Sequence, residues 1–193
     1  MRNRTPTIIV LGILTVVLEL AFLHSNAASQ GSDCDEECRS SLAAARAATA
    51  KYHDVNNAWA DGFIDPLVCV QSPSGAMGNH FVNPARTQDI NVDVTEPEVL
   101  LYLPDSATGR RLIGVEYIAP VIVNGVGPWF GGPGDPPPPG QFNPAPVLFG
   151  RAFAGPMPGH EPGMPWHYDL HVWLWLHNPD GMFALFNPAI NCP

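Results

Sequence analysis

The sequence has little positive charge. It contains nine lysines and arginines against 18 acidic residues, a formal charge of -9, and Lys51 is the single lysine. Nucleic-acid binding needs a basic face that displaces counterions from phosphate. The composition therefore argues against DNA or RNA as a partner of this protein. It disfavours binding to anionic membrane surfaces for the same reason.

Familiar catalytic signatures are also missing. The chain has no G-x-S-x-G elbow, no P-loop, no G-x-G-x-x-G after a strand and no H-E-x-x-H. Serine hydrolases, phosphate-cradling enzymes, dinucleotide enzymes and zincins thus lose their usual sequence support. Disorder is excluded as well, because 46% of the residues are hydrophobic and only 14% are charged.

The N-terminus has the pattern of an export signal. Arg2 and Arg4 precede an apolar stretch at residues 8–23, and small residues lead to Ala27. An uncleaved anchor is the alternative, but a span wants about 20 apolar residues, and this shorter stretch contains Glu19. We predict a signal peptide at 1–27, one domain at 28–193, a secreted or periplasmic location, and no stable membrane span after cleavage.

Four cysteines lie in the exported part, and an oxidising compartment favours disulfides among them. We predict a disulfide between Cys69 and Cys192, because closing such a long loop stabilises the folded state by about 4 to 5 kcal/mol in the chain-entropy model. Cys34 and Cys38 then pair locally or stay reduced. A metal site on the C-x-x-x-C spacing has less support, since no second ligand pair follows at zinc-finger spacing.

The fold class predicted is α+β, with an N-terminal amphipathic helix packed on a twisted antiparallel sheet or a partly closed β-barrel. The helix is expected over 32–61, capped by Ser32 or Asp33 and ended by Gly62. Its apolar stripe comprises Leu42, Ala45, Thr49, Tyr52, Asn56, Trp59 and Phe63.

Strands are expected where short apolar runs alternate with turn residues. Segments 98–103 and 112–118 should form a hairpin, in which Leu112 shares one face with Glu116. Further strands are expected at 80–82, 121–123, 147–153 and 166–177. The 22 prolines and 18 glycines make the chain loop-rich, and 125–140, with its four successive prolines, must be a loop.

Histidines and carboxylates concentrate in the last of these strands. In extended geometry His167, Asp169 and His171 share a face with Trp173, whereas Tyr168, Leu170 and Val172 form the opposite, core-facing side. The alpha carbons of His167 and His171 are then about 13 Å apart, too far to share one metal easily. Just before this strand, a proline-rich loop presents His160 and Glu161.

The hypothesis that follows is a metal pocket formed by His80, Glu116 and either His167 or His171. Imidazoles with a carboxylate suit zinc, iron, manganese or copper. We expect the pocket beside the helix, and its other lining residues are His53, His160, Glu161, Asp169 and Trp173.

Two alternatives stay open. One is a hydrogen-bonded cleft in which Glu116 pairs with Arg111 or Arg151. The other is a non-catalytic extracytoplasmic binding protein that stacks a sugar or a small apolar ligand on its tryptophans, which are Trp129, Trp166, Trp173 and Trp175.

The stretches GPMPGHEPGMPWHYDLHVWLWLHNPDGMF, KYHDVNNAWADGF and LIGVEYIAP together resemble a family of exported bacterial proteins of unassigned function. The resemblance covers most of 28–193 and implies a bacterial exported protein, but no particular activity. The histidines and the carboxylate inside the shared stretches are His53, Glu116, His160, His167 and His171.

Overall fold

A computed structural model of the chain describes residues 34–65, 68–104, 110–160 and 163–193. Its helical part comprises α1 (Glu36–Thr49), a 3-10 turn η1 (Ala50–His53) and α2 (Val55–Ala60). The single helix predicted over 32–61 is therefore wrong. The cap of α1 is Asp35, whose carboxylate accepts from the Cys38 amide, while the predicted caps Ser32 and Asp33 lie outside the described residues.

The helix is interrupted because Asp54 adopts an extended conformation and caps α2, accepting from the Asn56 amide. The 3-10 turn before it also changes which side chains face inward. The predicted apolar stripe is buried from Leu42 to Tyr52 and again at Phe63, which follows α2, but not at Asn56 or Trp59. Beyond the turn Ala58 is buried, whereas Trp59, expected on the stripe, is 47% exposed.

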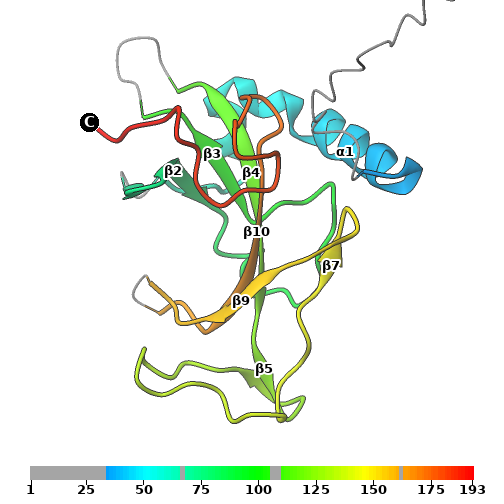
Figure 1. Cartoon of the computed structure of the whole chain (residues 1–193), viewed down its shortest axis with the longest axis vertical. Helices are drawn as coiled ribbons and strands as arrows, with labels where there is room; N and C mark the ends of the chain where they lie inside the picture. The colour runs from blue at the N-terminus through cyan, green and yellow to red at the C-terminus, as the bar shows by residue number, and fades with distance from the viewer. Residues whose placement is uncertain (1–33, 66–67, 105–109, 161–162) are drawn as a thin grey trace, which may run out of the picture.

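The main sheet has six strands within the described residues, in the order β1-β2-β3-β4-β10-β9, and every neighbouring pair is antiparallel. They are β1 (Cys69–Ser72), β2 (Gly75–Val82), β3 (Val99–Tyr102), β4 (Leu112–Pro120), β10 (His167–Val172) and β9 (Ala154–Met157). The sheet curls around its long central strand β4 (Figure 1). The α+β class with a curled antiparallel sheet is confirmed.

Smaller ladders join the sheet in the loop-rich region. They are β5 (Ile122–Val123) with β6 (Gly127–Pro128), and β7 (Val147–Leu148) with β8 (Arg151–Ala152). Segment 147–153, predicted as one strand, is thus a tight hairpin. Its turn places Phe149 and Gly150 at positive φ.

The predicted hairpin at 98–103 and 112–118 is confirmed by the pairing of β3 with β4. The strand predicted over 166–177 is shorter, because β10 ends at Val172. The next two residues leave the ladder: the Trp173 amide donates to Met182 and the Leu174 amide donates back to Val172.

Side chains from the two faces of the sheet join different apolar clusters. Leu100, Val115 and Leu170 belong to a large cluster that also contains the buried apolar residues of α1, namely Cys38, Leu42 and Ala45. A smaller cluster on the other face contains Val99, Leu101, Ile113, Ile118 and Trp173.

One detail of β4 differs from the sequence prediction. Leu112 packs with Val115 in the large cluster rather than sharing the face of Glu116. The cause is an extra residue in β4: Leu101 pairs with Gly114 and Tyr102 pairs with Leu112, so Ile113 has no partner in the ladder. Such a bulge shifts the alternation of faces by one residue.

Two disulfides are present. Cys69 on β1 is joined to Cys192 near the C-terminus, across 123 positions of sequence, and Cys34 is joined to Cys38 across four. The short bridge is accommodated because Cys34 lies before the first residue of α1. Within the described ranges, no helix is long and apolar enough to cross a membrane.

We expect the two disulfides to differ in their effect on stability. In the chain-entropy model, Cys69→Ala with Cys192→Ala removes about 4 to 5 kcal/mol of unfolding free energy, against about 2 kcal/mol for the short loop. Urea denaturation of both double variants measures this difference. The variant with Cys34→Ala and Cys38→Ala is the matched control, and equal losses would contradict the loop-length argument.

Candidate metal centre

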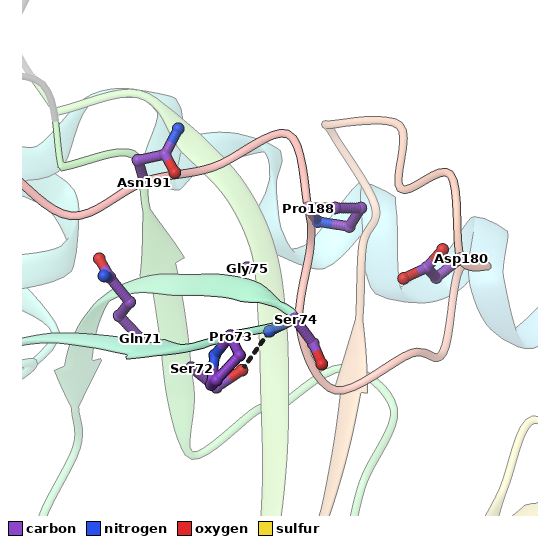
Figure 2. A pocket seen from close by; sticks show the side chains of 8 residues that line it. All are labelled: Gln71, Ser72, Pro73, Ser74, Gly75, Asp180, Pro188 and Asn191. Carbon is purple, nitrogen blue, oxygen red and sulfur yellow. Dashed lines mark hydrogen bonds between the residues drawn. The ribbon is translucent and has the colours of Figure 1, made fainter.

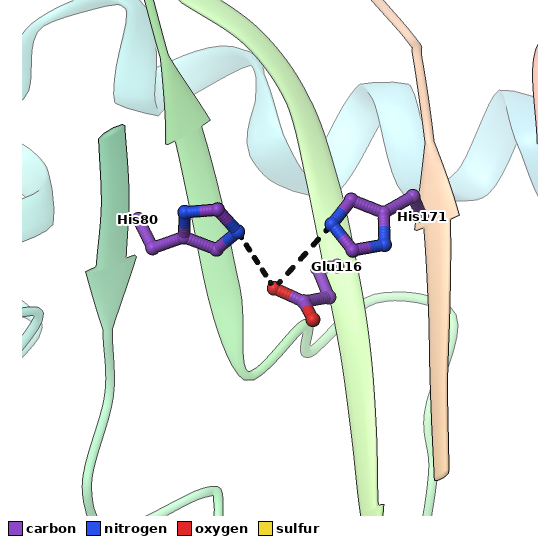
Figure 3. Close-up of side chains that lie close together, drawn as sticks. All are labelled: His80, Glu116 and His171. Carbon is purple, nitrogen blue, oxygen red and sulfur yellow. Dashed lines mark ion pairs between the residues drawn. The ribbon is translucent and has the colours of Figure 1, made fainter. Parts of the chain in front are cut away.

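Strands β2, β4 and β10 of the main sheet bring His80, Glu116 and His171 together. Glu116 on β4 pairs directly with His171 on β10. On its other side Glu116 pairs with Val99 of β3, and His80 reaches over from β2, where it pairs with Leu101. Figure 3 shows both imidazoles pointing toward the carboxylate from either side.

Glycine at position 78 helps to place His80 on β2. Gly78 has φ +93°, and a Cβ atom there would lie 2.7 Å from the Tyr102 carbonyl oxygen. A residue with a side chain would therefore be strained and would push β2 away from β3. The glycine lets the two strands approach closely just before His80 turns toward Glu116.

The three ligand-type atoms are close enough to share one ion. His80 Nε2 lies 3.4 Å and His171 Nε2 lies 3.8 Å from the same carboxylate oxygen, Glu116 Oε2. One donor atom from each residue lies within 4.8 Å of the other two. The two imidazole rings meet edge to face, with centroids 5.9 Å apart.

Burial governs the protonation of these groups. It raises the pKa of Glu116 well above its ordinary value, and the nearby carboxylates of Asp169 and Glu98 raise it further. It lowers the pKa of His80 to about 4 and that of His171 well below 6.5. Both imidazoles are thus neutral at neutral pH, the form in which nitrogen binds a metal.

Several polar atoms here lack a hydrogen-bond partner in the described part of the chain. They are His80 Nδ1, Glu116 Oε2, both ring nitrogens of His171, Asp169 Oδ1 and His167 Nε2. Buried polar atoms without partners are costly and rare in native proteins. This concentration on one sheet face singles it out as the candidate site for a bound ion.

Asp169 and His167 continue this face along β10. Asp169 Oδ2 lies 3.9 Å from His171 Nδ1, within ion-pair distance but too far for a hydrogen bond. Burial raises the pKa of Asp169 to about 6 and lowers that of His167 to about 4. His167 pairs with Pro120, four positions along β4 from Glu116, so the structure does not bring it into the group of three.

The remaining predicted pocket residues are placed apart from one another. His160 is exposed, and its ring lies 5.3 Å from that of His167. His53 stacks edge to face on Trp175 at 4.5 Å, and Trp175 packs against the large cluster, on the face opposite Glu116. The prediction that His53 lines the pocket beside the helix is therefore wrong. Glu161 lies outside the described residues.

Trp173, predicted to line the pocket, is instead part of the smaller apolar cluster. It is 3% exposed, and its indole donates to the Ala184 carbonyl oxygen at 2.6 Å. Trp166 is likewise buried and donates to Gly131. Because these rings are engaged with the protein itself, they are not available to stack on a sugar or an apolar ligand.

The alternative pairing of Glu116 with an arginine is also not seen. Arg111 is exposed, and the guanidinium of Arg151 lies over the Phe183 ring at 5.5 Å. The ion-pair neighbours that the described structure gives Glu116 are the two imidazoles.

A surface hollow of about 370 Å³ lies elsewhere, between the β1–β2 turn and the C-terminal segment (Figure 2). Its lining residues are Gln71, Ser72, Pro73, Ser74, Gly75, Asp180, Pro188 and Asn191. None of the predicted site residues is among them. The hollow offers one carboxylate and no imidazole, so it is a poorer candidate for chemistry than the centre on the sheet.

Sequence reasoning overlooked Glu98, a third buried carboxylate near the centre besides Glu116 and Asp169. It is 1% exposed, and its Oε2 accepts from the Ile118 amide at 3.0 Å. Burial raises its pKa to about 7. The available signal was a carboxylate at the start of an otherwise apolar strand, the same signal that singled out Glu116.

Glu98 should make stability fall as pH rises. Because its pKa moves from 4.5 to about 7 on folding, its burial costs little below pH 4.5 and most above pH 7. We expect Glu98→Gln, which can still accept from Ile118, to gain about 3 kcal/mol over wild type between pH 4.5 and pH 8. Urea denaturation across this range measures it. Parallel pH profiles for the two proteins would contradict the expectation.

Compared with protein-family models, with curated proteins and with solved structures, the chain matches none of them. Its function must therefore be inferred from the geometry of the centre itself.

Proposed function

We propose that the protein is an extracytoplasmic metal-binding protein in which His80, Glu116 and His171 hold one divalent cation. The observation that supports this is the convergence of three donor atoms from three strands to within 4.8 Å of one another. Glu116 and His171 are nearly inaccessible, with side chains 3% and 1% exposed, whereas the side chain of His80 is 12% exposed. The cation would reach the site along His80.

The donor set agrees with a transition metal. Two neutral imidazoles and one carboxylate suit zinc, iron, manganese or copper, and they suit calcium or magnesium less well. A metal held by three protein ligands keeps coordination positions for water or a small molecule. Such a metal lowers the pKa of bound water, so this centre is equipped for chemistry as well as for storage.

We infer further that the protein works outside the cytoplasm. The two disulfides support this location. It agrees with a cleaved signal peptide at 1–27 and with membership of the family of exported bacterial proteins suggested by the shared stretches. A small-molecule ligand of the metal is the partner that fits an open coordination position.

The helical segment is inferred to support the sheet from behind the centre. The Tyr102 hydroxyl on β3 donates to the Tyr52 carbonyl oxygen at 2.6 Å, and Arg46 Nε donates to the Leu174 carbonyl oxygen. Both contacts lie on the face opposite Glu116. They would hold the strands in register and so preserve the spacing of the three ligands.

Purified protein should contain a transition metal that depends on His171. The full chain, exported to an oxidising compartment, should carry at least one equivalent of zinc, iron, manganese or copper by elemental mass spectrometry. His171→Gln removes a ligand nitrogen and should lose one equivalent. His177→Gln changes an exposed histidine outside the centre and should lose none.

The outcome that would overturn the proposal is specific. A wild-type protein without stoichiometric metal, which also fails to take up added zinc, would show that the centre is held by hydrogen bonds alone. Equal metal content in wild type, His171→Gln and His177→Gln would show that the metal lies elsewhere.

Zinc should stabilise the wild type but not Glu116→Gln. At a zinc concentration one hundred times Kd, mass action adds about 2.7 kcal/mol to the unfolding free energy. Loss of the one anionic ligand should reduce that gain to under about 1 kcal/mol. Without metal, Glu116→Gln should be at least as stable as wild type, since a buried carboxylate is removed.

Chemical denaturation with zinc and with a chelator provides both measurements. Glu96→Gln is the matched control, because Glu96 has a side chain 65% exposed and should keep the full zinc effect. An equal zinc effect in all three proteins would rule out Glu116 as a ligand.

A further inference from the structure

We propose that the cation held by His80, Glu116 and His171 takes a small inorganic anion, such as hydroxide or azide, as its external ligand and excludes organic molecules. This inference rests on the proposed function, because it needs the cation in place. It goes beyond that function by naming the class of ligand that the open coordination positions accept.

Access to the three protein ligands is narrow. The side chains of Glu116 and His171 are 3% and 1% exposed, and that of His80 is 12% exposed. A peptide, a polysaccharide or another bulky substrate cannot bring a reacting bond to a metal in such a site while the sheet stays intact. Only a molecule small enough to pass one partly exposed imidazole can reach it.

Apolar side chains flank Glu116 on its face of the sheet. Val99 pairs with Glu116 from β3 and is 1% exposed. Ile118 lies two residues further along β4, hence on the same face, and is 4% exposed. Both residues belong to the smaller apolar cluster. The carboxylate therefore has packed hydrocarbon beside it, which leaves little space for a substrate.

Gly114 shows how tightly the sheet is packed in the other direction along β4. It lies two residues before Glu116 and pairs with Leu101. A Cβ atom at Gly114 would lie 2.7 Å from the Val172 carbonyl oxygen and 3.4 Å from Leu101 Cδ1. Since even one methyl group would overlap a neighbouring atom, an organic ligand has no room at this position.

The surface hollow does not supply the missing space. Pockets for organic ligands have volumes of about 300 to 1,000 Å³, and the hollow of about 370 Å³ is in that range. However, none of His80, Glu116 and His171 lines it (Figure 2). An organic molecule bound in the hollow would thus not be a ligand of the cation.

Charge selects an anion among the small ligands. Imidazoles bind a metal in their neutral form, so Glu116 is the one negative ligand of a divalent cation, which keeps a net positive charge. Asp169 Oδ2 lies 3.9 Å from His171 Nδ1, whereas Glu116 Oε2 lies 3.8 Å from Nε2 of the same ring. Uncompensated charge is costly in a buried site, and a small anion bound directly to the cation compensates it.

Water can supply such an anion. A bound zinc ion lowers the pKa of its water to about 7, so hydroxide forms on the metal near neutral pH. The O–H bond that breaks releases its proton to the solvent, and the oxygen keeps the electron pair and stays on the metal. Hydroxide is thus the ligand expected when no other small anion is present.

Cobalt(II) bound to the full chain provides the test, because its visible absorption changes when its ligands change. Azide and benzoate carry the same charge and differ in size. Azide should change the cobalt spectrum and reach saturation, whereas benzoate should bind at least one hundredfold more weakly. His171→Gln should lose the cobalt spectrum, and the matched control His177→Gln should respond to azide as the wild type does.

The possible results separate this inference from the proposed function. Cobalt bound through His171 that does not respond to azide, or that binds benzoate as tightly as azide, would overturn the inference and leave the metal centre standing. An equal azide response in wild type and His171→Gln would place the cobalt elsewhere and overturn both, as would failure of the wild type to bind cobalt.

Discussion

The burial of Glu116 is the constraint on which the centre depends. A carboxylate 2% exposed on an apolar sheet face cannot remain ionised without a compensating charge, because desolvation of an anion costs several kcal/mol. Its two neighbours are imidazoles whose own pKa values burial lowers. They offer lone pairs instead of positive charge, so the fold concentrates acceptors at one point, and the ion pairs among the described residues bring no lysine or arginine to Glu116.

The geometry of the sheet gathers these acceptor groups around Glu116. Antiparallel pairing sets His171 directly opposite Glu116, and a shift of one residue would turn either side chain to the other face. The bulge at Ile113 allows Leu112 to enter the large cluster while Glu116 lies on the opposite face, beside Val99 of the smaller cluster.

The sequence patterns predicted the parts of the fold that depend on local periodicity. The β3–β4 hairpin and the core face of β10, with Tyr168, Leu170 and Val172, followed from alternation of apolar residues. The break of the helix at Asp54 did not, because an aspartate inside a helical pattern gives no warning that it will cap a new turn. The end of β10 at Val172 depends on a tertiary hydrogen bond from Trp173 to Met182.

The candidate site likewise has features that local sequence predicts and others that depend on contacts between strands. Residue types placed His80, Glu116 and His171 among the metal ligands, but spacing along one strand could not choose between His167 and His171. That choice depends on register between strands, which places Glu116 opposite one histidine and Pro120 opposite the other. Glu98 carried a sequence signal, a carboxylate at the start of an apolar run, but its partner, the Ile118 amide on β4, is set by the pairing of β3 with β4.

The scarcity of basic residues gains meaning from this arrangement. Glu116 and Asp169 are buried, and the ion-pair neighbours that the described structure gives them are histidines rather than lysine or arginine. A protein that needed only stability could pair such carboxylates with arginine or replace them with apolar residues. Retaining two buried carboxylates beside neutral imidazoles makes sense when the missing positive charge comes from a bound cation.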